Sequence, residues 1–208
     1  PAKKVLVTGN TGIDSLLHCL NNGMPRKYPE FSFLRPGKKL VLVTCHRRES
    51  FGAPLQHICG ALKELVRLRK DVHVVYPVHL NPEVRRVVMK ELSGIPSITL
   101  LEPLSYDRQV YLMSKAAVIL TDSGGIQEEA PSLRVPVLVL REVTERPEGV
   151  RLGFARVVGL NKAKIVREAL KLLSSRGNSA RGKVSNPYGD GKASARILNI
   201  MDRYSKIS

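Results

Sequence analysis

The stretch AAVILTDSGGIQEEAPS, residues 116–132, decides the fold. Residues 116–120 form an apolar run rich in Val, Ile and Leu, which is typical of a strand buried on both faces. A turn follows, and a helix-forming segment then begins at Ile126 and ends at Pro131. A strand, a Gly-containing turn and a helix in this order place free backbone N–H groups at the carboxyl end of the strand. Open α/β sheets bind phosphorylated ligands at that position.

The turn itself has two interpretations on these residues alone. In the first, Ser123 and the backbone amides of Gly124 and Gly125 hold a phosphate group. In the second, Asp122 or Ser123 caps a helix and the glycines only make a tight turn. Short motifs need structural context before either interpretation is chosen.

Strands and helices alternate regularly in the rest of the chain. Apolar runs predict strands at residues 40–44, 72–78, 97–101, 135–140 and 155–159, and amphipathic spacing predicts helices at residues 55–68, 82–92, 106–115, 161–173 and 192–204. This alternation predicts the α/β class, with a doubly wound, Rossmann-like parallel sheet covered by helices on both faces.

The first forty residues differ from this pattern. Residues 3–10 read as a strand and residues 11–20 as a helix, and a single strand and helix cannot bury a core. We therefore expect residues 1–20 to be the end of another domain. The polar, proline-containing segment 21–38 reads as a linker, and residues 39–190 read as the main domain.

The composition indicates which classes of binding partner to expect. The formal net charge is +16, with 34 Lys and Arg against 18 Asp and Glu, so anionic partners are expected. The basic residues are not interleaved with stacking aromatics, and we do not expect a nucleic-acid partner. No apolar run reaches the ~18 residues of a membrane span, so no membrane partner is expected. Three cysteines without a metal-ligand pattern predict no metal site and reduced thiols in the cytoplasm.

Residues that follow the predicted strands are the candidates for function, because the carboxyl ends of parallel strands meet at one edge. His46 is the leading candidate for a functional residue, since it directly follows an apolar strand and two neighbouring arginines favour a neutral imidazole. His79 follows the next strand and is a weaker binding candidate. Arg47, Arg48 and Arg146 suit charge-assisted hydrogen bonds to a diphosphate.

Two adjacent carboxylates follow the turn. Glu129 suits a bidentate acceptor for the two hydroxyls of a ribose, whereas Glu128 points elsewhere on the helix and is structural or faces a domain cleft. The sequence contains no Walker A loop, and no G-x-G-x-x-G opens a strand–helix turn. This counts against an NTPase and a dehydrogenase.

Several motifs together carry a family resemblance that covers nearly the whole chain. The chain resembles the non-hydrolysing UDP-N-acetylglucosamine 2-epimerases in VTGNTGID (7–14), VLVTCHRRESFG (41–52), VYPVHLNP (75–82), LTDSGGIQEEAPSL (120–133), PVLVLREVTERPEGV (136–150) and NPYGDGKAS (186–194). The resemblance implies a GT-B type architecture, with two Rossmann-like domains and a UDP-sugar between them. This chain would supply the second domain, and its final helix, within residues 191–208, would pack back toward the first.

The resemblance also implies a reaction. These enzymes interconvert UDP-GlcNAc and UDP-ManNAc by eliminating UDP and adding it back to the opposite configuration at C2, without cofactor or metal. Implied roles fall on residues already chosen: His46 as the active-site histidine near the diphosphate, Ser123, Gly124 and Gly125 as the phosphate turn, Glu129 on the ribose and Arg146 on the substrate. In some bacterial members, residues matching Arg47 and His79 contact a second, allosteric UDP-GlcNAc.

The departures from the family pattern limit this expectation. The family's acid/base carboxylates belong to the first domain, so we expect this chain to be the UDP-binding half and inactive alone, completed by a first domain in the same chain or in a partner. The family commonly forms homodimers. Leu104 and Gln109 stand near the expected uracil pocket, where backbone groups would contact the base, and Arg134 stands where Gly is common.

Two alternatives stay open: a stand-alone UDP-sugar-binding module without turnover, and the nucleotide-binding half of a GT-B glycosyltransferase. The HRRE and TERPE segments count against the glycosyltransferase.

Overall fold

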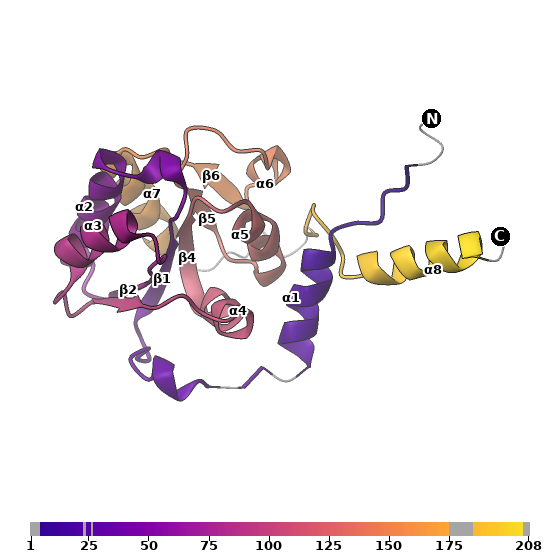
Figure 1. Ribbon diagram of the computed structural model, residues 1–208. Coiled ribbons are helices and arrows are strands. Elements are labelled where there is room, and N and C mark those ends of the chain that lie inside the picture. The colour runs from indigo at the N-terminus through magenta and orange to yellow at the C-terminus, as the bar shows by residue number, and fades with distance from the viewer. Residues whose placement is uncertain (1–4, 23, 26, 175–184, 206–208) are drawn as a thin grey trace.

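The computed structural model describes residues 5–22, 24–25, 27–174 and 185–205, and its centre is a parallel sheet of six strands (Figure 1). The strand order is β3-β2-β1-β4-β5-β6. The strands are β1 (Lys39–Thr44), β2 (Val72–Pro77), β3 (Ile98–Leu101), β4 (Ala116–Thr121), β5 (Val137–Val139) and β6 (Ala155–Val157). The predicted doubly wound α/β fold is confirmed, and each end of these six strands lies within two residues of its predicted position.

Helices connect the strands and cover both faces of the sheet (Figure 1). They are α1 (Thr11–Asn21), α2 (Ala53–Leu68), α3 (Pro82–Leu92), α4 (Tyr106–Lys115), α5 (Gly124–Glu129), α6 (Pro147–Arg151), α7 (Lys162–Ser174) and α8 (Ala193–Ser205). Short 3-10 turns lie at Pro29–Phe31, Arg48–Ser50 and Ala130–Leu133.

Side-chain alternation along the strands divides the core into two clusters. In β1, Val41 and Val43 belong to the cluster that holds α2, α3 and α7, whereas Leu40 and Leu42 belong to the cluster that holds α4. Successive side chains of a strand point to opposite faces, so each cluster fills one face of the sheet. The apolar stripe of α2 shows the helical counterpart of this pattern, with Leu55, Ile58, Leu62 and Leu65 buried at spacings of three and four.

The N-terminal segment differs from the prediction. The strand predicted over residues 3–10 is wrong for residues 5–10, which have no regular structure, while residues 3 and 4 lie outside the described part. An extended segment needs a neighbouring strand for its backbone hydrogen bonds, and the described chain offers none here. The helix predicted over residues 11–20 is confirmed as α1, with Asn10 accepting from the Gly12 N–H at its start.

The proline-containing segment 21–38 packs against the sheet domain more closely than its polar composition indicated. Tyr28 and Phe31 are buried, and the Phe31 ring stacks on Tyr111 of α4 with 5.7 Å between centroids. The Tyr28 hydroxyl donates to the Asp107 carboxylate at 2.6 Å. Part of the loop predicted between α7 and α8, residues 175–184, lies outside the described residues.

Helix α8 extends away from the sheet domain and is held mainly at its first turn (Figure 1). The Asp14 carboxylate of α1 accepts from the backbone N–H groups of Ala193 and Ser194, at 3.1 and 2.7 Å. Further along the helix, Leu198 and Met201 are each 61% exposed. Across all described helices, none combines the length and the apolar character that crossing a membrane requires.

Candidate functional site

The candidate site lies where the central strands β1 and β4 end side by side. Thr44 and Thr121 are register partners, and their hydroxyl oxygens are 2.6 Å apart. After β1 the chain continues into α2 on one face of the sheet, and after β4 it continues into α5, where Ile126 packs against the core of the other face. Such a topological switch point opens a crevice at the carboxyl edge, which is where α/β sheets bind ligands.

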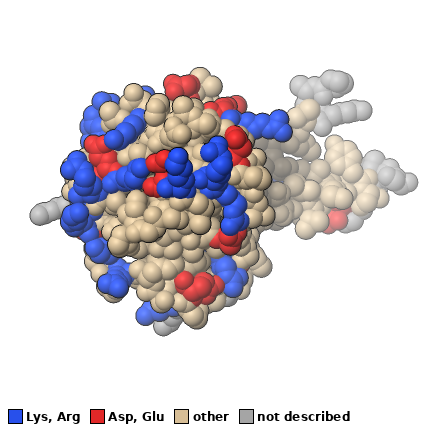
Figure 2. Space-filling view, turned by 60° about the vertical axis from the view of Figure 1, so that its left-hand side comes forward, with Lys and Arg blue, Asp and Glu red and all other residues tan. Residues whose placement is uncertain are grey.

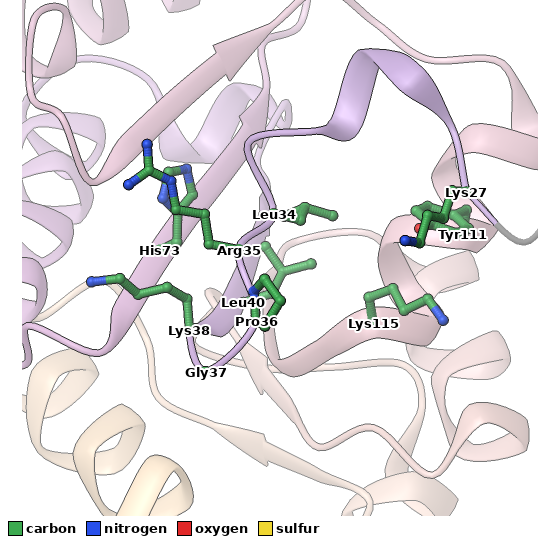
Figure 3. A pocket seen from close by; sticks show the side chains of 10 residues that line it. All are labelled: Lys27, Leu34, Arg35, Pro36, Gly37, Lys38, Leu40, His73, Tyr111 and Lys115. Carbon is green, nitrogen blue, oxygen red and sulfur yellow. The ribbon is translucent and has the colours of Figure 1, made fainter.

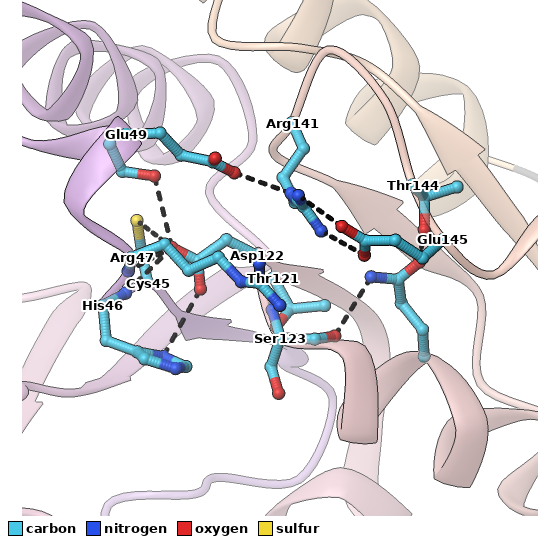
Figure 4. Close-up of polar contacts among 12 residues, drawn as sticks. Cys45, His46, Arg47, Glu49, Thr121, Asp122, Ser123, Arg141, Thr144 and Glu145 are labelled. Atoms are coloured by element: carbon cyan, nitrogen blue, oxygen red, sulfur yellow. Dashed lines mark hydrogen bonds and ion pairs between the residues drawn. The ribbon is translucent and has the colours of Figure 1, made fainter.

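Asp122, directly after β4, fixes the loop that follows β1 (Figure 4). Its side chain is fully buried. One carboxylate oxygen accepts from the backbone N–H groups of His46 and Arg47, both at 2.9 Å, and from the Cys45 thiol and the Ser50 hydroxyl, both at 3.2 Å. Burial, followed by the charge of Asp122, raises the pKa of the Cys45 thiol well above its usual value.

The capped-turn interpretation does not describe these residues. Ser123 occupies the N-cap position of α5, but its side chain makes no capping hydrogen bond. One carboxylate oxygen of Asp122 accepts hydrogen bonds from a loop more than seventy residues earlier in the chain, and the other oxygen has no hydrogen-bond partner among the described residues. Sequence reasoning did not assign Asp122 this role, because its signal is a tertiary contact rather than a local pattern.

His46 lies between a carboxylate and a second histidine. Its Nδ1 is 3.4 Å from the free oxygen of Asp122, and its ring stacks on His79 with 5.7 Å between centroids and 20° between planes. The sequence indicated that arginines would be the charges beside this imidazole. The structure places the Asp122 carboxylate against it, which orients the ring and favours a proton on Nδ1.

A pocket of about 230 Å³ opens beside this histidine pair. It is lined by Thr44, Cys45, His46, Pro77, His79, Pro103, Leu104, Gln109, Ser123 and Ile126. Its lining is largely apolar, but the Nε2 of Gln109 is buried there without a hydrogen-bond partner. An unpartnered buried amide is costly, and a ligand acceptor would satisfy it.

Arg146 lies over the glycine turn on the other side of Ser123. Its guanidinium is 3.5 Å from the position that a Cβ on Gly124 would take. Arg146 Nε donates to Glu128, and Glu128 also accepts from the Asn10 side-chain amide at 2.6 Å. Glu128 thus anchors the arginine and ties the N-terminal segment to α5. This agrees with the structural role expected for Glu128.

Glu129, one residue further, contacts a different partner because adjacent helical residues point about 100° apart. Its Oε1 accepts from the Tyr106 hydroxyl at 2.9 Å. Burial is the main cause that raises the pKa of Glu129, and the charge of Glu128 adds to it, while the Tyr106 hydrogen bond opposes both. Burial and Glu129 in turn raise the pKa of Tyr106.

Arg141 is a further residue that the sequence did not single out. Its side chain is only 7% exposed, and it donates to Glu49 at 2.6 Å and to both oxygens of Glu145 at 2.7 and 2.9 Å (Figure 4). Hydrogen bonds from Arg141 lower the pKa of Glu145 to about 2. Arg141 therefore joins the loop after β5 to the loop after β1. The i, i+4 spacing within REVTERPE was the available signal.

The structure brings His46, His79 and Ser123 to one pocket, with Gly124 and Arg146 beside it and Arg47 in the same loop as His46. In the described part of the chain, no group of three or more His, Cys, Asp or Glu side chains is arranged to hold a metal ion.

Comparison with known proteins gives consistent matches. The family described as UDP-N-acetylglucosamine 2-epimerase matches residues 1–202. The UDP-N-acetylglucosamine 2-epimerase of Salmonella typhimurium is 45% identical, over 98% of this chain and 56% of its own length. Among solved structures, the S. aureus MnaA–UDP co-structure is 41% identical, with a TM-score of 0.89 over 100% of this chain and 56% of that one. The Neisseria meningitidis epimerase bound to UDP-GlcNAc is 40% identical, with a TM-score of 0.87 over 98% and 56%. The chain spans about half the length of the curated relatives it matches.

Proposed function

Because this chain belongs to the UDP-N-acetylglucosamine 2-epimerase family, we propose that it supplies the half of such an enzyme that binds the UDP part of UDP-GlcNAc or UDP-ManNAc. The observation that carries the proposal is the pocket at the switch point, where His46, Ser123 and the unpartnered Gln109 amide meet. Relatives solved with UDP and with UDP-GlcNAc support this ligand class.

We assign different residues of the site to different parts of the ligand. Arg146 and the turn of Ser123, Gly124 and Gly125 take the diphosphate, and Glu129 accepts from the ribose hydroxyls. Eliminating UDP breaks the bond between C1 and the diphosphate oxygen, so negative charge develops on the diphosphate. Arg146 and the backbone amides stabilise that charge in the transition state. His46, held by Asp122, contacts the leaving group from the other loop.

The C2 proton needs a base within hydrogen-bond reach, and the resemblance assigns that base to a first domain. We assign the completion of the site to such a domain, in the same chain or in a partner chain. Exposed apolar side chains at Val5 and Val7 in the N-terminal segment and at Leu198 and Met201 in α8 support a partner that covers these two segments. We also propose that the protein forms a homodimer. We further propose that it acts in the cytoplasm, which agrees with the free thiols of Cys19, Cys45 and Cys59.

A second UDP-sugar site that includes Arg47 and His79 is also part of the proposal. His79 lines the same pocket as His46. A ligand on His79 would therefore lie beside the stacked rings of His46 and His79.

Exchange at C2 tests the proposed function. The chain is incubated with UDP-GlcNAc in D2O, with and without the first domain of a relative, and deuterium at C2 is followed by NMR. We expect exchange only when the first domain is present. Exchange by the chain alone would show that the missing carboxylates are not needed. UDP binding without exchange in either mixture would favour the non-catalytic binding module, and transfer of the sugar to an acceptor would favour the glycosyltransferase.

Replacing Gln109 by leucine should move two quantities in opposite directions. The substitution removes a buried, unpartnered amide, so the melting temperature should stay the same or rise. It also removes the hydrogen bond that Gln109 Nε2 would donate to a ligand acceptor in this pocket, so the Kd for UDP should rise by roughly five- to tenfold. Calorimetry with UDP and a thermal melt measure both. A fall in stability with unchanged UDP affinity would place Gln109 outside the base pocket.

The affinity for UDP-GlcNAc should depend on the ionisation of Glu129. Because the pKa of Glu129 is raised, the carboxyl gains a proton as the pH falls through that raised value, and it then loses acceptor capacity for the ribose hydroxyls. Binding should therefore weaken on acidification, and Glu129→Gln should remove this step. UDP-GlcNAc is the proper ligand, since its diphosphate has no second ionisation near neutral pH. An unchanged pH profile in Glu129→Gln would contradict the assignment.

A further inference from the structure

A second cavity lies at the opposite edge of the sheet (Figure 3). Its volume is about 330 Å³, and it is lined by Lys27, Leu34, Arg35, Pro36, Gly37, Lys38, Leu40, His73, Tyr111 and Lys115. Leu40 stands near the start of β1, whereas Thr44 of the candidate site ends the same strand. At about 3.3 Å per residue, these four steps separate the two pockets by roughly 13 Å.

All charged residues that line this cavity are positively charged. Four of the ten residues are Lys or Arg, and none is Asp or Glu. Elsewhere the signs are mixed: Figure 2 shows Asp and Glu side chains among the Lys and Arg of one face. Arginines such as Arg69, Arg85 and Arg108 are held by carboxylates.

The four cations of the cavity have no carboxylate partner among the described residues. Lys38 Nζ donates to the Lys70 carbonyl oxygen, and the Lys115 ammonium lies 5.4 Å from the Tyr111 ring centroid. Lys27 and Arg35 are exposed. Uncompensated cations around a concave surface raise the local concentration of anions.

The cations stand on two sides of an apolar floor. In Figure 3, Arg35 and Lys38 lie on the side of His73, and Lys27 and Lys115 lie on the side of Tyr111, with Leu34, Pro36 and Leu40 between them. A ligand in this cavity would meet positive charge at both ends and apolar surface in the middle. The volume is at the lower end of the range for small-molecule pockets.

We propose that this cavity binds a small phosphorylated metabolite that carries two or more phosphate groups. Ammonium and guanidinium groups from both walls would make charge-assisted hydrogen bonds to the phosphate oxygens. The apolar floor would contact the remainder of the ligand. Nothing in the proposed UDP site requires these residues.

His73 provides a reporter inside the cavity. Its Nε2 hydrogen-bonds with the Thr99 hydroxyl at 2.8 Å, and its ring stacks on Phe33. Burial lowers the pKa of His73, and the charges of Lys38 and Arg35 lower it further. A polyanion beside these two cations would offset their effect, so the pKa of His73 should rise on binding.

Inorganic tripolyphosphate is the probe. The pKa of His73 is followed by NMR and the affinity by calorimetry, in the parent chain, in Arg146→Ala and in the double variant Arg35→Ala/Lys115→Ala. Arg35 and Lys115 are both exposed, so the fold should tolerate their loss. Lys90→Ala, an exposed lysine of α3 outside the cavity, controls for the change in net charge.

We expect tripolyphosphate to raise the pKa of His73 in the parent, in Arg146→Ala and in Lys90→Ala. In the double variant the rise should disappear, and the Kd of this site should increase roughly tenfold or more. The proposal is overturned if His73 does not respond, if the double variant responds like the parent, or if Arg146→Ala abolishes all binding. Single-stranded oligonucleotide binding that depends on Arg35 and Lys115 and excludes tripolyphosphate would assign the cavity to nucleic acid instead. Failure of the UDP proposal would leave the His73 response unchanged, so the two results are distinguishable.

Discussion

Asp122→Ala should lower the free energy of unfolding by about 3–5 kcal/mol, because it removes a buried acceptor shared by four donors of the loop after β1. The backbone N–H groups of His46 and Arg47 and the Ser50 hydroxyl would all lose their partner. For a chain of this length we expect the melting temperature to fall by roughly 10 °C. Thermal and denaturant unfolding measure the change.

A matched control separates this effect from the loss of any aspartate. Asp71→Ala removes a carboxylate that pairs with Arg69 near the surface. The Asp71 side chain is 40% exposed and the Arg69 side chain 24%. Its cost should stay within about 1 kcal/mol. Equal stability losses in Asp71→Ala and Asp122→Ala would contradict the central role of Asp122.

Asp122→Asn tests how the carboxylate positions His46. The amide oxygen can replace the carboxylate oxygen that accepts from the loop, so most of the stability should return. The amide NH2 would then face His46 Nδ1, where the carboxylate oxygen stood at 3.4 Å. A donor at that point favours the tautomer with its proton on Nε2, and imidazole nitrogen shifts in NMR report this change. An unchanged tautomer would mean that Asp122 holds only the backbone.

Arg146→Ala should weaken UDP binding by roughly 10- to 100-fold, since a charge-assisted hydrogen bond to a phosphate contributes about 1.5–3 kcal/mol. The guanidinium already lies over the Gly124 turn and is anchored by Glu128, so it is oriented before the ligand arrives. Arg146→Lys should recover part of the affinity, because the charge returns without the planar fork. Isothermal calorimetry with UDP gives the values.

Arg156→Ala is the matched control for this change. Arg156 lies in β6 and pairs with Glu168 at 3.1 Å, so the variant loses the same charge away from the turn. Its UDP affinity should be nearly that of the parent. If Arg146→Ala and Arg156→Ala bind UDP equally well, Arg146 does not contact the diphosphate.

The sequence predicted the elements whose signal is local. Apolar runs located β1, β2 and β4, and the spacing of Leu55, Ile58 and Leu62 located α2, because burial on a sheet imposes those periods. The strand expected over residues 3–10 carried the same apolar signal and was wrong for residues 5–10. An apolar run indicates that a segment can form a strand. It does not indicate whether a neighbouring strand is present to pair with that segment.

The candidate site also has a part that the sequence predicted and a part that it did not. Strand ends could be located from the sequence, so His46, His79 and Ser123 were predicted at one edge and line one pocket. The contacts that hold them were not predictable. Asp122 and Arg141 act on residues more than seventy and ninety positions away, and no local pattern encodes such partners.

The contact between Asp122 and the loop after β1 also changes how that loop opens. A surface loop ordinarily exchanges its amide hydrogens with solvent through small local openings. The amides of His46 and Arg47 are instead held by the Asp122 carboxylate, which directly follows the neighbouring strand β4, so we expect them to be freed when β1 and β4 separate. Their hydrogen exchange should therefore be as slow as that of the sheet core, which would make two loop residues a direct measure of global unfolding.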